Sequence, residues 1–423
     1  MKRYRKLLLI LPGIIALASS CKKYDIAPQV ADPSYMRVFN NITASVDVLH
    51  AGQAAPFLTF LMDPQMDGNT PMDAATVGDY LTTRKLFSLS YPINEANSSI
   101  GDGTIGPYGA PDPPVLYPQN YDYPGNAHVL TAPVINGFDL SSWAQIPSGK
   151  HRLMFVVRPQ NSIPFKQLSK EQRSVIMLDT TVNFQKGEVY TLEVVARNLD
   201  KNNYGLYVRK EQFIHQAFDQ GRIYTGFVNL SGETPANAQY GTKYYFPKKI
   251  KINYTYFIAN DAASSPTYGT VFDIVPGYNN VYYSTLTNKR DTTINYFSIP
   301  QQPVNAFFYQ GVMRLYANLD SPFSNSLNGS MPHLDYTLVD ADDPEIVTST
   351  PFKGFQLSAS ANPTTFNNYN AETTQAKNFT VNQTALVNIN NIFKAYSTLN
   401  IMEISYDRVY MMQVQRGINN LSK

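Results

Sequence analysis

Cysteine, histidine, tryptophan and charge are all scarce in this sequence. Its 423 residues include one cysteine, five histidines and one tryptophan, and only 16% of them are charged. One cysteine cannot form an intramolecular disulfide, and no two histidines stand three or four positions apart, as they would in a helical zinc site. The 34 basic and 32 acidic residues nearly balance, so we expect no nucleic-acid partner.

Long apolar runs are also missing. No segment reaches the roughly 18 consecutive apolar residues that cross a bilayer as a helix. Apolar residues still make up 43% of the chain, with 30 tyrosines and 23 phenylalanines. This content is enough for sizeable cores and excludes wholesale disorder, and the length predicts two or three domains.

The first 21 residues have the pattern of an export signal. A basic start precedes the apolar segment 7–18, which is too short to span a membrane. The sequence Leu17-Ala18-Ser19-Ser20-Cys21 resembles the bacterial lipobox, whose cysteine receives a diacylglycerol and, on its freed amine, a further acyl chain. It departs from the usual pattern because alanine stands three residues before the cysteine. We predict a signal peptide at 1–20 and lipidation of Cys21; a plain secretory signal is the alternative.

The residues after Cys21 indicate where such a lipoprotein would reside. Two or more acyl chains anchor a protein stably, so the resemblance implies the membrane as a partner through a lipid anchor. Lys22 stands where many inner-membrane lipoproteins of Gram-negative bacteria have aspartate, which favours the outer membrane. Residues 21–33 are polar, contain two prolines and are predicted to be a tether.

The remaining chain is predicted to be all-β, with many short strands in sandwich-like modules. Residues 249–260 alternate apolar and polar side chains, which is typical of a strand with one buried face. Residues 189–196 are apolar on both faces, as in a central strand. Little helix is expected: Ser169 and Gln172 could form a capping box on a short helix to about Met177. Residues 384–397 have helical spacing, with a pair of strands as the alternative.

Two pairs of similar short segments predict two tandem modules. Tyr35-Met-Arg-Val-Phe-Asn40 resembles Tyr224-Thr-Gly-Phe-Val-Asn229, and Val189-Tyr-Thr-Leu-Glu-Val194 resembles Val409-Tyr-Met-Met-Gln-Val414. The first module is predicted at 34–215 and the second at 222–423. The first carries a long irregular insert, 93–133, rich in glycine, proline and tyrosine; such loops are usually functional or mobile.

Motifs that would carry chemistry are weak. Gly101-Asp-Gly-Thr-Ile-Gly106 has the letters of a dinucleotide-binding loop but neither the preceding strand nor the following helix that such a site needs. No G-x-S-x-G elbow occurs. Two acidic clusters, around Gly68 and at 340–345, could in principle bind calcium, but neither has EF-hand spacing and solvated turns explain both. We therefore predict a non-enzymatic protein without cofactor or metal.

Aromatic residues supply the candidate ligand-binding site. The insert carries uneven tyrosines, and a ring stacked beside a few polar groups is a common way to bind sugars. An alternative is that the insert folds onto the sandwich and its rings are packing. The candidate residues are Tyr108, Tyr117, Tyr121, Tyr123 and Trp143.

Several short motifs resemble an Ig-like domain of unknown function found in envelope lipoproteins of Bacteroidetes type, often in tandem. These motifs are Arg37-Val38, Val46-Asp47-Val48, Gly52, and Pro147-Ser148-Gly149 before a strand. The resemblance implies an Ig-like β-sandwich and a surface- or periplasm-facing binding or structural role, with another envelope protein or a glycan as partner. It transfers no catalytic residue. The alternatives are a glycan-binding accessory lipoprotein of a polysaccharide uptake system and, more weakly, an envelope hydrolase.

Overall fold

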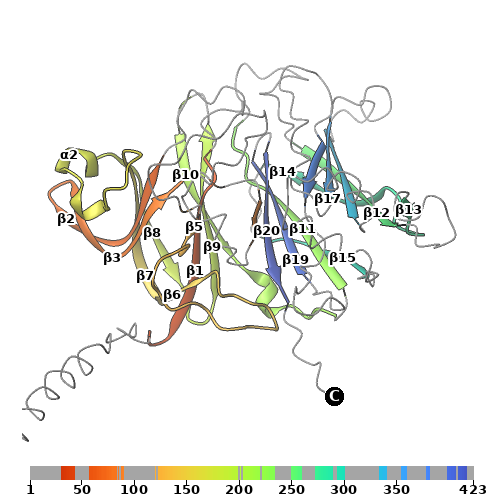
Figure 1. Ribbon diagram of the computed structural model, residues 1–423, viewed down its shortest axis with the longest axis horizontal. Helices are drawn as coiled ribbons and strands as arrows, with labels where there is room; N and C mark the ends of the chain where they lie inside the picture. The colour runs from red at the N-terminus through yellow and green to blue at the C-terminus, as the bar shows by residue number, and fades with distance from the viewer. Residues whose placement is uncertain are drawn as a thin grey trace, which may run out of the picture.

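The computed structural model is built almost wholly of β-strands, which confirms the predicted all-β class (Figure 1). The Ig-like details of the strand order stay a prediction. The structure describes residues 30–42, 57–82, 84, 87–89, 120, 122–198, 201, 203–219, 222–233, 249–259, 272–288, 293–300, 333–340, 354–359, 378–381, 398–405 and 408–416.

The first half of the chain forms two sheets. Sheet A contains, in spatial order, β10 (Asn203–Lys210), β9 (Val189–Asn198), β1 (Pro33–Asn40) and β5 (Asp122–Tyr123), with β6 (Ala144–Pro147) also paired to β1. Sheet B contains β3 (Thr70–Leu81), β2 (Leu58–Asp67), β7 (Gly149–Val157) and β8 (Ile176–Phe184).

The second half also forms two sheets. Sheet C contains β15 (Phe297–Pro300), β11 (Arg222–Asn229), β19 (Thr398–Ser405), β20 (Arg408–Gln415) and β4 (Phe87–Leu89). Sheet D contains β13 (Phe272–Ile274), β12 (Lys249–Ala259), β16 (His333–Asp340), β17 (Gly354–Ala359) and β18 (Asn378–Val381), with β14 (Val281–Thr287) also paired to β12.

The four sheets are stacked in the order B, A, C, D, so that A and C are the inner layers (Figure 1). One apolar core joins A to B through residues such as Val38, Phe60 and Phe155. A second core joins A to C, with Phe39 and Ile401 among its members. Sheet A is thus covered on both faces, which is why β9 is buried almost throughout, as its doubly apolar sequence predicts.

Sheet C meets sheet D through aromatic rings. Phe227 of β11 lies 5.5 Å from Tyr283 of β14, and Tyr254 of β12 stacks on Phe297 of β15 at 4.0 Å between ring centroids. The alternation predicted for β12 is confirmed over its described side chains: Ile250, Ile252 and Tyr254 are buried, whereas Lys249 and Lys251 are exposed and Asn253 is half-buried.

Helical segments are few and short among the described residues: η2 (Phe165–Gln167), α2 (Lys170–Arg173) and η3 (Gln212–His215). The capping box is confirmed, because the Ser169 hydroxyl accepts the Gln172 amide and the Gln172 side chain accepts the Ser169 amide. The helix ends at Arg173, however, and not at Met177, since β8 already begins at Ile176 and pairs with β7. The helix candidate at 384–397 lies outside the described residues.

The two inner sheets contain the same three-strand unit. In sheet A, β1 pairs in parallel with β9, and β9 pairs antiparallel with β10. In sheet C, β11, β19 and β20 pair in the same way. The registers agree as well, because Tyr35 lies opposite Val189 and Tyr224 lies opposite Leu399.

The strand ends repeat too. The Asn41 amide donates to the Val194 carbonyl in one unit, and the Leu230 amide donates to the Ile404 carbonyl in the other. The next amide in each unit is bound by an asparagine side chain: Asn40 Oδ1 accepts the Ile42 amide, and Asn229 Oδ1 accepts the Ser231 amide. These matches support the predicted correspondence between residues 35–40 and 224–229.

The second predicted correspondence, between residues 189–194 and 409–414, is wrong. Residues 189–194 occupy the place of 399–404 in β19, and not that of 409–414 in β20, because the register equates Glu193 with Glu403. The modules are also not separate in space, since β4 at Phe87–Leu89 pairs with β20 of the other half. The module boundaries at 34–215 and 222–423 stay predictions.

The inner sheets have two distinct ends. Strand β1 starts at Pro33, and β5 enters at its far end, where Val38 pairs with Tyr123. Asn198, the last residue of β9, and Glu233, which follows β11, also meet at this far end through a β-bridge. We call the Pro33 end the tether end and the Asn40 end the loop end.

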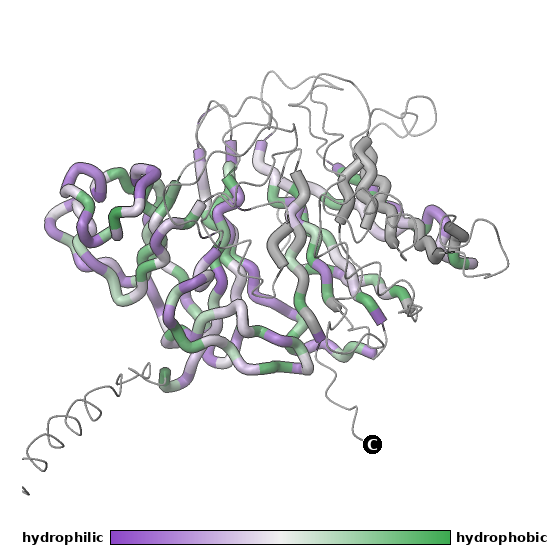
Figure 2. Tube along the Cα trace, in the orientation of Figure 1, coloured by the Kyte–Doolittle hydropathy of each residue, from purple (hydrophilic) through white to green (hydrophobic). Residues whose placement is uncertain are grey.

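Hydropathy varies over short distances along the chain, with green and purple segments alternating on the strands (Figure 2). Among the described residues, no helix has the length and apolar character needed to cross a membrane.

Candidate functional site: a buried charge cluster

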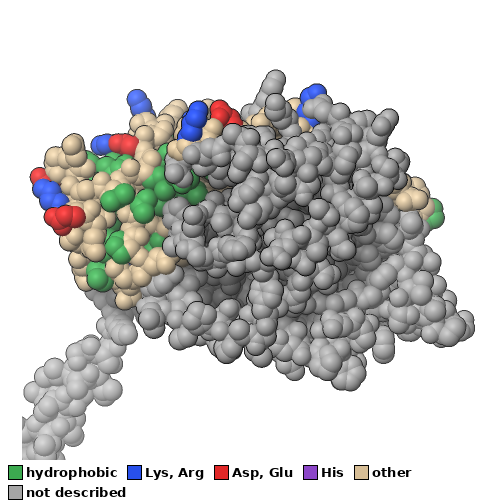
Figure 3. Space-filling view, turned by 90° about the horizontal axis from the view of Figure 1, so that it is seen from above, with side chains coloured by type: hydrophobic (Ala, Val, Ile, Leu, Met, Phe, Trp, Pro, Cys, Tyr) green, Lys and Arg blue, Asp and Glu red, His purple; other side chains and the backbone are tan. Residues whose placement is uncertain are grey.

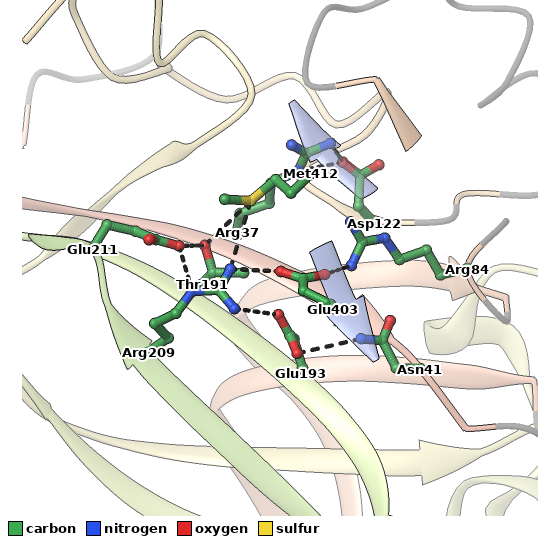
Figure 4. Close-up of polar contacts among 10 residues, drawn as sticks. All are labelled: Arg37, Asn41, Arg84, Asp122, Thr191, Glu193, Arg209, Glu211, Glu403 and Met412. Atoms are coloured by element: carbon green, nitrogen blue, oxygen red, sulfur yellow. Dashed lines mark hydrogen bonds and ion pairs between the residues drawn. The ribbon is translucent and has the colours of Figure 1, made fainter. Parts of the chain in front are cut away.

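The most unusual feature of the molecule is a group of charged side chains buried between sheets A and C (Figure 4). Charged residues are rarely buried unless they are paired. Each of these seven side chains is at most 4% exposed: Arg37, Arg84, Asp122, Glu193, Arg209, Glu211 and Glu403.

Arg209 on β10 is at the centre of the cluster and pairs with three carboxylates. Its Nε lies 3.0 Å from Glu211 Oε1, its Nη1 lies 3.1 Å from Glu193 Oε1, and its Nη2 lies 2.6 Å from Glu403 Oε1. The planar guanidinium suits this role because its five N–H donors point in fixed directions. Since Glu403 belongs to sheet C, Arg209 ties the two inner sheets together.

Glu403 also pairs with Arg84, which follows β3. Its two carboxylate oxygens therefore face two guanidiniums from the first half of the chain. Glu193 has weaker donors: besides Arg209 it accepts only a 3.3 Å hydrogen bond from the Asn41 side chain among the contacts in Figure 4. The two equivalent glutamates thus sit in different electrostatic environments.

A second ion pair lies beside the first. Arg37 on β1 reaches Asp122 on β5, with its Nη2 2.6 Å and its Nε 2.8 Å from the same Oδ2 atom. The Phe39 ring lies near two cations, with Arg84 Cζ at 3.7 Å and Arg37 Cζ at 4.5 Å from its centroid. These cation–π contacts help to hold the arginines in an apolar interface.

Burial and pairing move the pKa values of the glutamates in opposite directions. Burial, together with the nearby Glu403 carboxylate, raises the pKa of Glu193 well above its ordinary value of 4.5. Burial alone would also raise the pKa of Glu403, but the Arg84 and Arg209 guanidiniums lower it to about 2. Burial raises the pKa of Glu211 as well, against the attraction of Arg209.

The cluster is suited to joining two layers of the protein. Its carboxylates and guanidiniums pair with one another and lie out of contact with solvent, so a soluble substrate would not reach them. Buried ion pairs of this kind are costly to break, because the remaining partner becomes an uncompensated buried charge. The arrangement therefore fixes how sheet A meets sheet C.

Tyr123 and Trp143, predicted to bind a ligand, are core residues, so the prediction is wrong for these two. Tyr123 is 2% exposed, and its ring lies 5.3 Å from that of Phe60 in the core between sheets A and B. Trp143 is fully buried in the core between A and C, beneath the Arg37 guanidinium. Neither ring can stack on a sugar, and Tyr123, which lies in the insert, matches the packing alternative.

The other candidates, Tyr108, Tyr117, Tyr121 and Cys21, lie outside the described residues. Their assignment stays a prediction.

The acidic residues around Gly68 are paired with separate cations. Asp67 pairs with Lys170 and Asp73 with Lys166, both on the segment of η2 and α2. Figure 3 shows such acidic and basic groups side by side at the rim of the described surface. Within the part of the chain that the structure describes, no three His, Cys, Asp or Glu residues are grouped so that they could hold a metal ion.

Sequence reasoning did not find the charge cluster, although one signal was present. Glu193 and Glu403 are the single charged residues of two largely apolar segments, 189–196 and 399–404. A charged residue in the middle of a doubly buried strand requires a buried partner. The arginines that supply it come from distant parts of the chain, so no local pattern identifies them.

Comparisons with known proteins give no family. No family model and no curated protein sequence matches this chain. One similar solved structure is described as "Alpha-glucan binding by a streptococcal virulence factor"; it is 7% identical, covers 92% of this chain and 100% of its own, and has a TM-score of 0.16. A putative cell adhesion protein from Parabacteroides distasonis is 7% identical over 91% and 99% of the two chains, with a TM-score of 0.15. Scores this low establish neither a shared fold nor a shared function.

Proposed function

We propose that this protein is a non-enzymatic lipoprotein of the outer membrane, anchored through Cys21, that carries binding loops on a rigid double sandwich. The anchor rests on the lipobox-like sequence before the only cysteine of the chain. The binding role rests on the way the strands direct the long insert.

The observation that supports this role is the separation of the two ends of sheet A. Pro33, where the tether is predicted to end, starts β1, while the insert rejoins the sheet at Asp122, opposite Phe39 near the other end of β1. A strand of eight residues is about 25 Å long. The insert therefore rejoins sheet A at the loop end, which is the end remote from the predicted anchor. A partner away from the membrane surface would reach the molecule at this end.

The charge cluster supports the same proposal. Binding loops work best on a scaffold that does not deform. The ion pairs of Arg209 and Arg84 with Glu403 cross between the inner sheets, so the two halves present their loop ends as one body.

A glycan is the alternative partner that the sequence favours. Tyr117 and Tyr121 precede the buried Tyr123 in the insert, so β5 fixes the chain only a few residues after them. A stacked ring contributes about 1 kcal/mol to binding. Loss of one ring should weaken sugar binding several-fold.

Anchoring is tested by metabolic labelling with a clickable palmitate analogue in cells that make the full chain. Wild type should be labelled and recovered with outer membranes, and Cys21→Ala should be neither. Equal labelling of the two proteins would contradict the proposal.

Binding is tested with a glycan array and with crosslinking to envelope proteins. Tyr117→Ala and Tyr121→Ala should weaken binding with little change in melting temperature. Tyr123→Ala is the matched control: it should lower the melting temperature strongly, because aromatic truncations in cores cost about 3–5 kcal/mol. Binding that is unchanged in both Tyr117→Ala and Tyr121→Ala would remove these residues from the site.

A further inference from the structure

A cavity of about 210 Å³ lies between β11 of sheet C and β14 of sheet D. Its wall is formed by residues 227–229 of β11, by residues 283–287 of β14 and, from the chain before β15, by Thr293 and Asn295. Pockets for drug-sized ligands measure about 300–1,000 Å³, so this cavity suits a smaller molecule. Thr285, Thr293 and Asn295 are exposed, so a ligand can enter from solvent beside them.

The two repeated units differ in what covers the edge of their first strand at this place. In sheet A, β5 pairs with β1 at Val38, near the loop end. Phe227 occupies the equivalent position of β11 in sheet C. Among the described residues, β15 pairs with β11 only at 222–225, and the Phe227 amide donates to the Tyr283 hydroxyl at 3.3 Å. The cavity therefore borders the part of the β11 edge that corresponds to the part of β1 covered by β5.

The last residue of β11 carries a buried donor that lacks a partner. Asn40 and Asn229 are equivalent, and in both the side-chain oxygen accepts the amide two residues further along the chain. The Asn40 Nδ2 also donates to the Leu81 carbonyl of β3, at 3.4 Å. Asn229 lines the cavity, and its buried Nδ2 has no hydrogen-bond partner among the described residues. Because an unsatisfied buried donor is costly, an oxygen atom of a bound molecule would stabilise this position.

The cavity wall favours a neutral molecule with many hydroxyl groups. None of the described residues that form it is charged, so an ionic ligand would lose its hydration without gaining a counter-ion. Burial raises the pKa of Tyr283 to about 12, so this phenol is also uncharged at physiological pH. Phe227 and Tyr283 add aromatic side chains to the wall. The hydroxyl and amide groups, which can both donate and accept hydrogen bonds, belong to Asn229, Ser284, Thr285, Thr287, Thr293 and Asn295.

We infer that this cavity binds one ring of a neutral sugar, with an oxygen atom of the sugar accepting a hydrogen bond from the Asn229 side chain. The site lies in the second half of the chain, at the loop end of β11. It is separate from the tyrosines of the insert and from Cys21. It therefore stands whether or not those residues have the roles proposed above.

Saturation-transfer-difference NMR on the purified full-length protein tests this inference, because the method detects weak binding. The probes are glucose, galactose, mannose and N-acetylglucosamine, and at least one of them should give a signal. Glucuronate and glucosamine are charged counterparts and should bind more weakly. No signal from any of the four neutral sugars would overturn the inference, and so would stronger binding of a charged counterpart.

Asn229→Ala and Asn40→Ala form a matched pair of variants. Each loses the hydrogen bond at its strand end, so both should melt at similar temperatures. Only Asn229→Ala should also weaken sugar binding, by about two- to tenfold, which is the effect of losing one hydrogen bond. Equal weakening in both variants would overturn the inference.

Thr293→Trp tests the location of the site without removing a buried group. Thr293 is exposed and lies outside the strands, so the protein should tolerate the larger side chain, which would fill the cavity and abolish the signal. Full binding by this variant would overturn the inference. A signal that survives in Thr293→Trp but is lost in Tyr117→Ala and Tyr121→Ala would place the sugar on the insert. That result would support the proposed function and overturn the cavity site.

Discussion

The two inner sheets are built to the same plan but carry different charges. The unit β1, β9 and β10 and the unit β11, β19 and β20 share strand order and register. Each places a buried glutamate, Glu193 or Glu403, at the same point of its central strand. The positions that hold Arg37 and Arg209 in the first unit hold Gly226 and Met412 in the second.

This difference shows that an equivalent place in the fold does not determine the state of a titratable group. All three arginines of the cluster come from the first half, and two of them reach across to Glu403. Their fields keep that glutamate ionised, whereas burial favours the protonated form of Glu193. The neighbours, and not the repeated strand position, decide the direction in which each pKa moves.

Replacement of each glutamate by glutamine should give the largest difference in stability between the two equivalent sites. Glu403→Gln removes the charge that faces Arg84 and Arg209, and loss of one partner from a buried ion pair costs about 3–5 kcal/mol. Glu193→Gln should cost less, because burial raises the pKa of Glu193 and so favours its neutral form, which the amide resembles. Urea unfolding at pH 7 measures both, and equal losses would show that the two sites are alike.

Acid should act on Glu403 and spare Glu193. The pKa of Glu403 is lowered to about 2 from an ordinary 4.5, so its stabilisation is present above pH 4.5 and is lost as the pH falls toward 2. A melting series from pH 5 to pH 2 should show a smaller decline in Glu403→Gln than in wild type. The same decline in both would exclude Glu403 as its source.

Gly226→Ala tests why the second unit lacks an arginine at the place of Arg37. A Cβ atom there would lie 2.3 Å from Ile294 Cγ2 and 2.8 Å from the Tyr296 ring. Overpacking of this kind costs about 1–3 kcal/mol. Gly205→Ala on β10 is the control, because its nearest neighbour is the flexible end of Arg197, and it should be tolerated. Thermal melting compares them, and a stable Gly226→Ala protein would show that the site has room.

The smallest effect should come from the repeated strand ends. The side chain of Asn40 accepts the Ile42 amide, and that of Asn229 accepts the Ser231 amide. Each hydrogen bond contributes about 1 kcal/mol, so Asn40→Ala and Asn229→Ala should destabilise by similar amounts in chemical unfolding. A loss confined to one of them would mean that the two strand ends are not equivalent in energy.

Local features of the sequence predicted much of the fold. The alternation in 249–254, the doubly apolar strand at 189–196 and the capping box of Ser169 and Gln172 are all confirmed. Each depends on residues close together in the chain. Strands β2 and β3 were not predicted, because the Pro, Asp and Gly residues in 58–81 resemble those of turns although the chain there pairs as a hairpin.

The candidate site was harder to predict, because a side chain's exposure depends on what covers it. Tyr123 and Trp143 have the composition of a sugar platform but lie in two cores. The Arg84 and Glu403 side chains pair across 319 positions of sequence. A local pattern carries no information about such a contact.

The sequence by itself determined the all-β class, the short capped helix, the central and half-buried strands and the correspondence of residues 35–40 with 224–229. Each depends on side-chain periodicity or turn chemistry within about a dozen residues, which is the range over which a strand or helix end is specified. Only the tertiary structure decided that β9 corresponds to β19, that three arginines of the first half pair with the buried carboxylates, and that the pKa values of Glu193 and Glu403 shift in opposite directions. Those outcomes depend on distances between residues far apart in sequence, because the dielectric environment and the partners of a buried charge exist only once the sheets have packed.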